Sequence, residues 1–182
     1  MKLKNFEERV LESKKIFDGR ILKLRVDTVA TPNGKIAVRE VIDHFVTAVI
    51  IPVTDDNEII FTRQYRLPVG KVLLELPAGR IEDNEDPQAG GQRELLEETG
   101  YTAAEWLKKL ACYSSPGYSN ELMHFFVARG LKKSGPKPDE DELIEIVRMP
   151  LKEAFKKLEK QEFEDAKTIM GLLVLKNDYR PA

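Results

Sequence analysis

The sequence contains few residues that bind soft metals or form crosslinks. Its 182 residues include a single cysteine, Cys112, and two histidines, His44 and His124. One cysteine excludes an intramolecular disulfide, and these three side chains are too few for a cysteine-rich zinc site. Any metal bound by this chain should therefore be held by oxygen ligands.

The chain also lacks a long apolar run and a marked excess of charge of either sign. Its longest mainly apolar stretch, residues 45–53, is far shorter than the roughly 20 residues needed to span a bilayer. Residues 1–9 are charged and have no apolar stretch typical of a signal peptide. We therefore expect a cytoplasmic protein with no membrane partner. With 29 Lys and Arg against 31 Asp and Glu, the net charge of -2 argues against a nucleic-acid polymer as partner.

The composition, 42% hydrophobic and 33% charged, indicates one domain with a buried core. Hydrophobic periodicity and turn residues set the expected elements. We expect strands at residues 21–29, 35–42, 45–53, 59–66, 72–76, 106–113, 122–128 and 143–149, helices at 87–99, 151–160 and 163–176, and turns at 31–34 and 77–79. Residues 45–53 and 59–66 are interpreted as central strands joined by a hairpin. The mixture of strands and helices indicates the α/β or α+β class.

The helix expected at residues 87–99 has clear boundaries. Asp86 can cap its N-terminus, Pro87 suits the first helical position, and Gly100 suits the left-handed position after the last turn. On a helical projection three carboxylates fall within an arc of about 100°. These carboxylates belong to Glu94, Glu97 and Glu98, and the opposite face, expected to contact the core, consists of Ala89, Leu95, Leu96 and Thr99.

Two interpretations of this acidic face are open from the residues alone. In most glutamate-rich helices such a face is solvated surface. Like charges this close are destabilising unless something neutralises them, so the carboxylates also fit an oxygen-only site for Mg²⁺ or Mn²⁺. Gly90 and Gly91 lie on the same face one turn earlier, and we expect them to leave room for a bulky ligand above the carboxylates.

The same residues resemble a known family motif. Gly79, Glu85 and residues 93–101 (Arg-Glu-Leu-Leu-Glu-Glu-Thr-Gly-Tyr) resemble the full Nudix box, G-x5-E-x7-R-E-U-x-E-E-x-G-U, with Tyr101 in place of the usual aliphatic residue. The resemblance implies the Nudix fold, an α/β/α sandwich with a mixed central sheet and additional N-terminal antiparallel strands. It also implies a divalent metal at the box and hydrolysis of a nucleoside diphosphate linked to another moiety.

The resemblance also assigns roles to individual residues. Glu94 and Glu98 look like metal-ligating carboxylates, Glu97 looks like a further ligand or supporting acid, and Ala78 looks like a backbone carbonyl ligand. Arg93 lies four residues before Glu97 on the helix, so it can pair with Glu97 and fix its rotamer. We therefore assign catalytic roles to Arg93, Glu97 and Glu98, which support attack by a metal-activated water.

Segments outside the box resemble ADP-ribose pyrophosphatases in particular. Residues 115–121 (Ser-Pro-Gly-Tyr-Ser-Asn-Glu) are similar to a Ser-Pro-Gly segment of those enzymes. Further similar segments are residues 39–41, 63–66, 74–79 and 165–168, and the likeness covers about residues 10–175. The positions assigned to substrate contact are Arg39, Arg66, Ser115 and Glu121, with Arg80 as a further candidate. Guanidinium groups suit this role because they bind phosphate oxygens bidentately.

Two assignments stay open. Arg63 and Arg66 are three residues apart on a strand and should face opposite sides; we favour Arg66 at the site and leave Arg63 between surface and ligand. For the general base, the resemblance favours Glu142 in the acidic loop 139–142, followed by Glu140 and Glu145. A solvated acidic loop is the alternative.

The expected function is Mg²⁺-dependent hydrolysis of ADP-ribose to AMP and ribose 5-phosphate. The alternatives are the same chemistry on another nucleotide sugar, such as GDP-mannose, and a non-catalytic nucleotide sensor. The resemblance further implies a homodimer. Residues 1–44 would form an N-terminal dimerisation domain, with residues 20–42 at the interface and Arg39 reaching the partner's site, and residues 45–182 would form the hydrolase domain.

Overall fold

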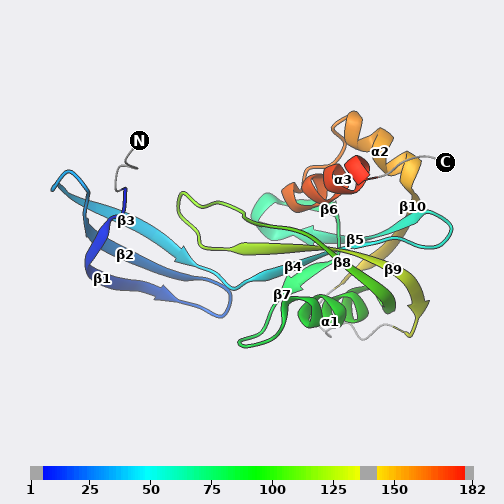
Figure 1. The fold of residues 1–182 in the computed structure, drawn as a ribbon, viewed down its shortest axis with the longest axis horizontal. Helices are drawn as coiled ribbons and strands as arrows, with labels where there is room; N and C mark the ends of the chain where they lie inside the picture. Colours follow the sequence, from blue (N-terminus) through cyan, green and yellow to red (C-terminus); the bar gives the residue numbers. More distant parts are fainter. Residues whose placement is uncertain (1–5, 136–142, 179–182) are drawn as a thin grey trace. The chain divides into compact units, whose positions relative to one another are not determined.

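The computed structural model describes residues 6–135 and 143–178 (Figure 1). Its strands are β1 (Arg9–Asp18), β2 (Lys23–Ala30), β3 (Ile36–Asp43), β4 (Thr47–Pro52), β5 (Glu58–Arg66), β6 (Lys71–Glu75), β7 (Ala78–Arg80), β8 (Tyr101–Tyr113), β9 (Leu122–Lys133) and β10 (Glu145–Pro150). Its helices are α1 (Pro87–Thr99), α2 (Leu151–Glu159) and α3 (Ala166–Asp178), and Leu67–Val69 form the short 3-10 helix η1. Within the two described ranges, no helix has the length and hydropathy needed to cross a bilayer.

Contacts between residues divide the chain into two compact units. The first unit is formed by residues up to Phe45 together with Cys112–Leu122, and the second by Val46–Ala111 and the residues from Met123 onward. The division expected from the sequence, at residues 44 and 45, assigns the segment 112–122 to the second part. Backbone bonds account for the difference, because the N–H of Ile42 donates to the carbonyl of Tyr118 at 2.7 Å.

The first unit is built on an antiparallel sheet in the order β1-β2-β3. The predicted turn at residues 31–34 joins β2 to β3, and Gly34 adopts a φ of 81° there. Every residue of β1 is exposed. Its sequence mixes apolar and charged side chains without clear alternation, so the pattern alone does not predict a strand at β1.

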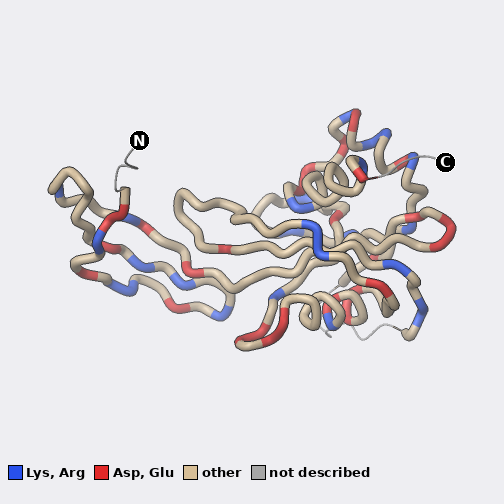
Figure 2. The backbone as a smooth tube through the Cα atoms, in the orientation of Figure 1, with Lys and Arg blue, Asp and Glu red and all other residues tan. Residues whose placement is uncertain are grey.

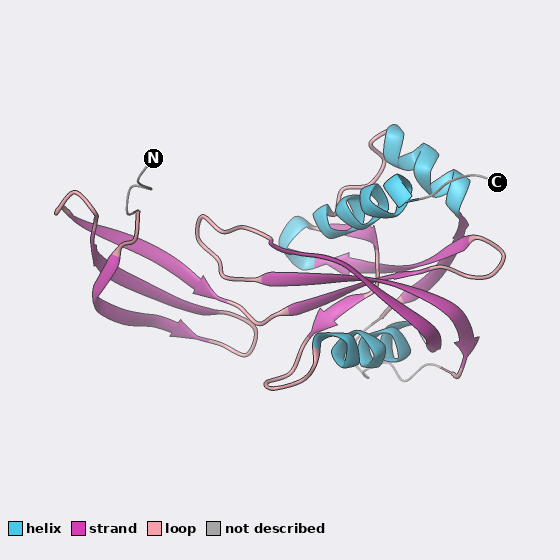
Figure 3. Ribbon diagram, in the orientation of Figure 1, coloured by secondary structure: helices cyan, strands magenta, loops and turns pink. Residues whose placement is uncertain are grey.

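The second unit contains two sheets, in the orders β7-β4-β9-β8 and β10-β5-β6. β4 runs parallel to β9 and antiparallel to β7, so the larger sheet is mixed. β4 is buried throughout, and its successive side chains point to opposite faces. Ile50 packs with Leu95 of α1, whereas Ile51 lies beside Gly171 of α3. Helix α1 therefore covers one face of the sheet and α2 and α3 lie on the other side, which confirms the α/β/α sandwich (Figures 1 and 3).

Two expectations about the strands are wrong. β4 and β5 begin a hairpin at the bridge between Val53 and Ile59, but β5 then pairs with β6 and β10 in the other sheet. β7 occupies part of the expected turn at residues 77–79. It pairs with residues 47–49 of β4, and three residues are too few to show a strand periodicity in the sequence.

Candidate active site

Helix α1 begins and ends where the sequence predicts. The carboxylate of Asp86 accepts hydrogen bonds from the backbone N–H groups of Gln88 and Ala89, at 2.9 and 3.2 Å. Gly100 follows the last turn with a φ of 70°, and its N–H donates to the carbonyl of Leu96. A side-chain cap of this kind contributes about 1 kcal/mol, so α1 is a well-anchored support for the side chains it carries.

The core face of α1 differs in part from the expectation. Leu95 and Thr99 are buried as predicted, but Leu96 is half-buried and Ala89 is exposed. The buried stripe is therefore displaced around the helix towards Gly91, which the projection had placed among the acids.

The expectation that Gly90 and Gly91 leave room for a ligand is wrong. Both glycines are buried. A Cβ atom at Gly91 would lie 3.4 Å from the ring of Trp106, and one at Gly90 would lie 3.0 Å from an oxygen of Glu85. The missing side chains instead let α1 pack closely on its neighbours.

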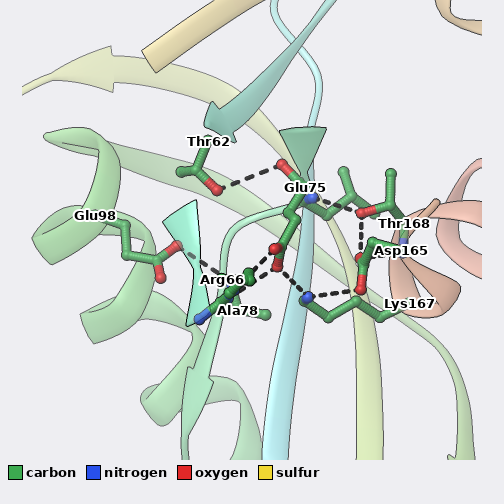
Figure 4. Close-up of polar contacts among 9 residues, drawn as sticks. Thr62, Arg66, Glu75, Ala78, Glu98, Asp165, Lys167 and Thr168 are labelled. Carbon is green, nitrogen blue, oxygen red and sulfur yellow. Dashed lines mark hydrogen bonds and ion pairs between the residues drawn. The ribbon is translucent and has the colours of Figure 1, made fainter. Parts of the chain in front are cut away.

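The acidic face of α1 lies against β7. The backbone N–H of Ala78 donates to the carboxylate of Glu98 at 3.1 Å (Figure 4). The carboxylate of Glu94 lies so close to Gly79 that a Cβ atom on Gly79 would be 2.1 Å from it. Two of the three predicted carboxylates are therefore held against the strand rather than spread into solvent.

Arg93 supplies the cation of this face. Its Nη1 lies 2.7 Å from an oxygen of Glu94 and 3.0 Å from an oxygen of Glu97. Its Nε and Nη2 lie 3.2 and 3.1 Å from the two oxygens of Glu85, and Nη2 also donates to the carbonyl of Arg80 at 2.7 Å. The predicted pair of Arg93 with Glu97 is confirmed, whereas its contacts with Glu85 and Arg80 were not foreseen.

These contacts stabilise the charged forms of both partners. The hydrogen bond from Arg93, followed by one from the backbone of Glu82, holds the pKa of Glu85 below its usual value. The bond to Glu85 is also the main reason that the pKa of Arg93 is raised, with Glu94 and Glu97 adding to the effect. Figure 2 shows acidic residues along the segment that leads into α1 and along α1 itself.

The donor set of this face fits a hard divalent cation by its chemistry. Glu94, Glu97 and Glu98 supply carboxylate oxygens, and the backbone of Ala78 in β7 contacts Glu98. Carboxylates and backbone carbonyls are ligand types that Mg²⁺ and Mn²⁺ prefer. Gly79 provides the space that the carboxylate of Glu94 occupies. In residues 6–135 and 143–178, no group of three acidic, histidine or cysteine side chains already has metal-binding geometry. Arg93 instead engages two of the carboxylates directly.

Arg66, predicted to contact substrate, is anchored by a buried carboxylate. Its Nε and Nη2 each lie 2.8 Å from an oxygen of Glu75, whose side chain is 1% exposed. Lys167 donates to the same carboxylate (Figure 4). Burial alone would raise the pKa of Glu75, but the bonds and charges of Arg66 and Lys167 outweigh it, and this pKa lies below its usual value.

The Arg66 cluster is electrostatically linked to the acidic face of α1. The pKa of Arg66 is raised, chiefly by the hydrogen bond to Glu75 and to a smaller extent by the charge of Glu98. A carboxylate assigned to the metal and a guanidinium assigned to the substrate are therefore within reach of each other's charge.

Glu75 and Lys167 are the functional candidates that sequence reasoning missed. Both lie in segments that it singled out, residues 74–79 and 165–168, but neither received a role. The sequence did contain a signal, because Glu75 lies between Leu74 and Leu76 in an apolar strand. A carboxylate buried in such a strand requires a cationic partner, which marks it as a candidate.

Arg63 has a different partner from Arg66. Its Nη1 donates to both oxygens of Glu145, at 2.9 and 3.1 Å, across the pairing of β5 with β10. Both side chains are exposed. This ion pair supports the interpretation of Arg63 as a surface residue. It also engages the carboxylate of Glu145, the third candidate for the general base.

Two further predictions for the second unit have different outcomes. The guanidinium of Arg80 lies 3.3 Å from Glu82, and its backbone carbonyl binds Arg93, so Arg80 adjoins the acidic face. Glu140 and Glu142 lie outside the described residues, and their assignment as the base stays a prediction.

Arg39, Ser115 and Glu121 lie in the first unit. Arg39 donates from Nε to Glu8 at 2.9 Å. The carbonyl of Ser115 accepts two backbone hydrogen bonds, at 3.1 and 2.9 Å, that close a turn. The carboxylate of Glu121 lies 3.8 Å from Nδ1 of His44, which makes an ion pair when that histidine is protonated.

Two family models match consecutive parts of this chain. Residues 43–172 match the NUDIX domain, and residues 8–42 match the nucleoside diphosphate sugar hydrolase N-terminal domain. The first match covers most of the chain and includes both β7 and α1. The chain therefore belongs to the Nudix hydrolase family.

Individual relatives are similar over nearly the whole chain. The chain is 39% identical over 176 residues to the methanol dehydrogenase activator of Bacillus methanolicus, covering 94% of each. It is 39% identical over 175 residues to the ADP-ribose pyrophosphatase of Bacillus subtilis (strain 168), covering 95% of each. Among solved structures, that of an ADP compounds hydrolase has a TM-score of 0.85 over 96% of both chains at 24% identity, a likeness of fold.

Proposed function

We propose that this chain hydrolyses the diphosphate bond of ADP-ribose, in a Mg²⁺-dependent reaction that releases AMP and ribose 5-phosphate. The observation that carries the proposal is the acidic face of α1, where Glu94 and Glu98 lie against β7 and Arg93 binds Glu94 and Glu97. The identity of 39% to a protein named ADP-ribose pyrophosphatase, over 95% of both chains, supports the choice of substrate.

Each residue of the acidic face has a proposed role. A bound Mg²⁺ or Mn²⁺ would activate water and offset the charge of the diphosphate oxygens. Glu94 and Glu98 would hold the cation, with Glu97 and the carbonyl of Ala78 as further ligands. Arg93 orients Glu94 and Glu97 through the bonds described above, so that a pair of like charges stays in place.

The remaining roles concern the substrate. Arg66 would bind the diphosphate, with Arg80 beside it, and Glu142 would accept a proton from the attacking water as the general base. By resemblance, Ser115 and Glu121 would contact the rest of the nucleotide sugar, and Arg39 would do so across a homodimer. In that arrangement residues 1–44 form the dimerisation domain and residues 45–182 the hydrolase domain.

A substrate panel tests the proposal. Purified protein with Mg²⁺ is given equal concentrations of ADP-ribose, GDP-mannose, UDP-glucose, NADH and diadenosine polyphosphates, and the products are separated by chromatography. We expect AMP and ribose 5-phosphate from ADP-ribose, formed faster than products from any other compound. The Glu98→Gln variant is the matched inactive control, because it keeps the size of the side chain while removing a carboxylate.

Other outcomes would change the proposal in defined ways. Faster turnover of GDP-mannose would keep the metal site and replace the substrate. No turnover of any compound, with the wild-type chain correctly folded, would contradict the hydrolase proposal and favour a nucleotide sensor.

A further inference from the structure

A series of hydrogen bonds joins the start of α3 to the end of β6 (Figure 4). Asp165 accepts bonds from the N–H and the hydroxyl of Thr168, at 2.9 and 2.6 Å, and from Lys167 at 2.9 Å. The hydroxyl oxygen of Thr168 in turn accepts a bond from the N–H of Leu76 at 2.8 Å. Lys167 donates to Glu75. Helix α3 therefore holds both the backbone and the carboxylate at this end of β6.

Glu75 uses only one edge of the Arg66 guanidinium. Its two oxygens accept bonds from Nε and Nη2. A guanidinium carries five N–H donors in one plane, so Nη1 and the second hydrogen of Nη2 form another edge that points away from Glu75. Within the described part of the chain, Nη1 of Arg66 has no hydrogen-bond partner, and the side chain is 40% exposed.

This second edge has the geometry to bind another pair of anionic oxygens. Two parallel N–H groups match the spacing of oxygens in a carboxylate or phosphate group. A long exposed arginine would normally lose much rotamer freedom on binding such a group, but Glu75 already fixes Arg66 in the folded chain. The ion pair therefore fixes the orientation of Arg66 and leaves the N–H groups of its second edge available to bind an anion.

We propose that Glu75 is a positioning residue for the reaction, which holds Arg66 so that its second edge meets the diphosphate of the substrate, and that Lys167 holds Glu75. The inference rests on the proposed function, because Arg66 is assigned there to the diphosphate. It gives a positioning role to two residues, Glu75 and Lys167, that need not contact the substrate themselves.

The alternative is that the cluster serves stability alone. Two cations, Arg66 and Lys167, face two acids, Glu75 and Asp165, and such a balanced set can hold α3 on β6 without any part in binding. The two explanations differ in one respect. A positioning role acts through Arg66, so the effect of changing Glu75 should disappear when Arg66 is already absent.

A double-mutant cycle makes this distinction. Glu75→Gln, Arg66→Met and the combined variant are compared with the wild-type chain by the KM and kcat for ADP-ribose. The Kd for ADP is measured alongside, because ADP carries a diphosphate but not the bond that is to be broken. We expect Glu75→Gln to raise KM and Kd by about 10- to 100-fold with a smaller change in kcat. The combined variant should bind no more weakly than Arg66→Met.

The matched control is Glu164→Gln, which removes the exposed ion pair between Glu164 and Lys71 of the same strand β6. It should leave KM and Kd unchanged. Unchanged KM and Kd in Glu75→Gln, or losses that simply multiply in the combined variant, would overturn the positioning role and leave a structural one.

Two further measurements keep the inference testable. If Glu75→Gln does not fold, Arg66→Lys replaces it, because a lysine cannot bind Glu75 with one edge and a diphosphate with another; a wild-type KM in Arg66→Lys would overturn the inference. If the wild-type chain binds ADP without hydrolysing ADP-ribose, the proposed function fails while the Kd values still test Glu75. A wild-type chain that does not bind ADP would overturn both.

Discussion

Gly79 shapes the site through the side chain it lacks. The carboxylate of Glu94 fills the volume where a Cβ atom would stand, 2.1 Å away. The φ angle of Gly79 is not in the left-handed region, so its backbone suits other residues. The glycine is therefore required by the approach of Glu94 and not by the shape of the strand.

This makes Gly79→Ala a specific change to the metal site. The new methyl group displaces the end of a flexible glutamate side chain, so we expect the fold to persist. We expect the affinity for Mn²⁺, measured by titration with electron paramagnetic resonance, to fall about 10-fold or more, as it does when the support of a metal ligand is lost. Gly91→Ala, whose new methyl group would meet Trp106 and not Glu94, serves as the control. Equal Mn²⁺ affinity in the Gly79→Ala and wild-type chains would contradict the placement of Glu94 in the metal site.

At this scale, what the sequence predicts depends on separation along the chain. The pair of Arg93 with Glu97 follows from helical spacing alone, and the structure confirms it. The bonds of Arg93 to Glu85 and to the carbonyl of Arg80 depend on how the preceding segment folds back on α1. The bond from Lys167 to Glu75 is harder still to foresee, because the two residues are 92 positions apart in the sequence.

Among the elements, α1 was predictable because its signals are local. Asp86, Pro87 and Gly100 mark its ends directly in the sequence. Strand β7 had no such signal, because Ala78–Arg80 become a strand only through pairing with β4. The acidic site thus consists of a helix that the sequence predicts well and a strand that it does not.

The glycines of α1 and α3 give a prediction about helix packing. Gly91→Ala places a methyl group at ordinary contact distance, 3.4 Å from Trp106, so the better helix propensity of alanine should stabilise the chain by up to about 1 kcal/mol. Gly171→Ala places one 2.4 Å from the buried Leu76, and we expect a loss of about 1–3 kcal/mol from overpacking. Urea unfolding of both variants measures the difference. Equal shifts in the same direction would contradict the close packing of Gly171 in α3 against Leu76.

At the scale of the whole molecule, local sequence patterns gave the wrong strand pairing where consecutive strands belong to different sheets. Residues 45–53 and 59–66 have the pattern of a hairpin, and the hairpin does begin at Val53 and Ile59. The partners of β5, however, are β6 and β10, and β10 is far along the chain. A turn signal identifies which strands are consecutive, but long-range packing decides which strands are paired.

The first unit leads to a prediction about assembly. Residues 20–42 of this unit leave large apolar side chains exposed, among them Ile21, Leu22, Ile36 and Val38. Burial of such residues is favourable, and we expect a homodimer that uses residues 20–42. Size-exclusion chromatography with light scattering should give twice the mass of the 20.8 kDa chain.

A variant of β3 and a matched control test whether the exposed apolar residues form the dimer interface. Val38→Lys introduces a charge on β3 and should shift the equilibrium towards the monomer, whereas Leu173→Lys changes an exposed apolar residue of α3 and should leave the mass unchanged. A wild-type monomer at working concentration would contradict the dimer and remove the role of Arg39 in a partner's site.

The most direct test of the account is the Mg²⁺ dependence of ADP-ribose hydrolysis in the wild-type and Glu98→Gln chains. We predict that the wild-type rate rises to saturation with Mg²⁺, is abolished by EDTA and returns when Mg²⁺ is restored. Glu98→Gln should lose at least about 100-fold in kcat while its thermal unfolding stays close to that of the wild type. Hydrolysis that persists in EDTA, or full activity in Glu98→Gln, would contradict the assignment of the acidic face of α1 as the active site.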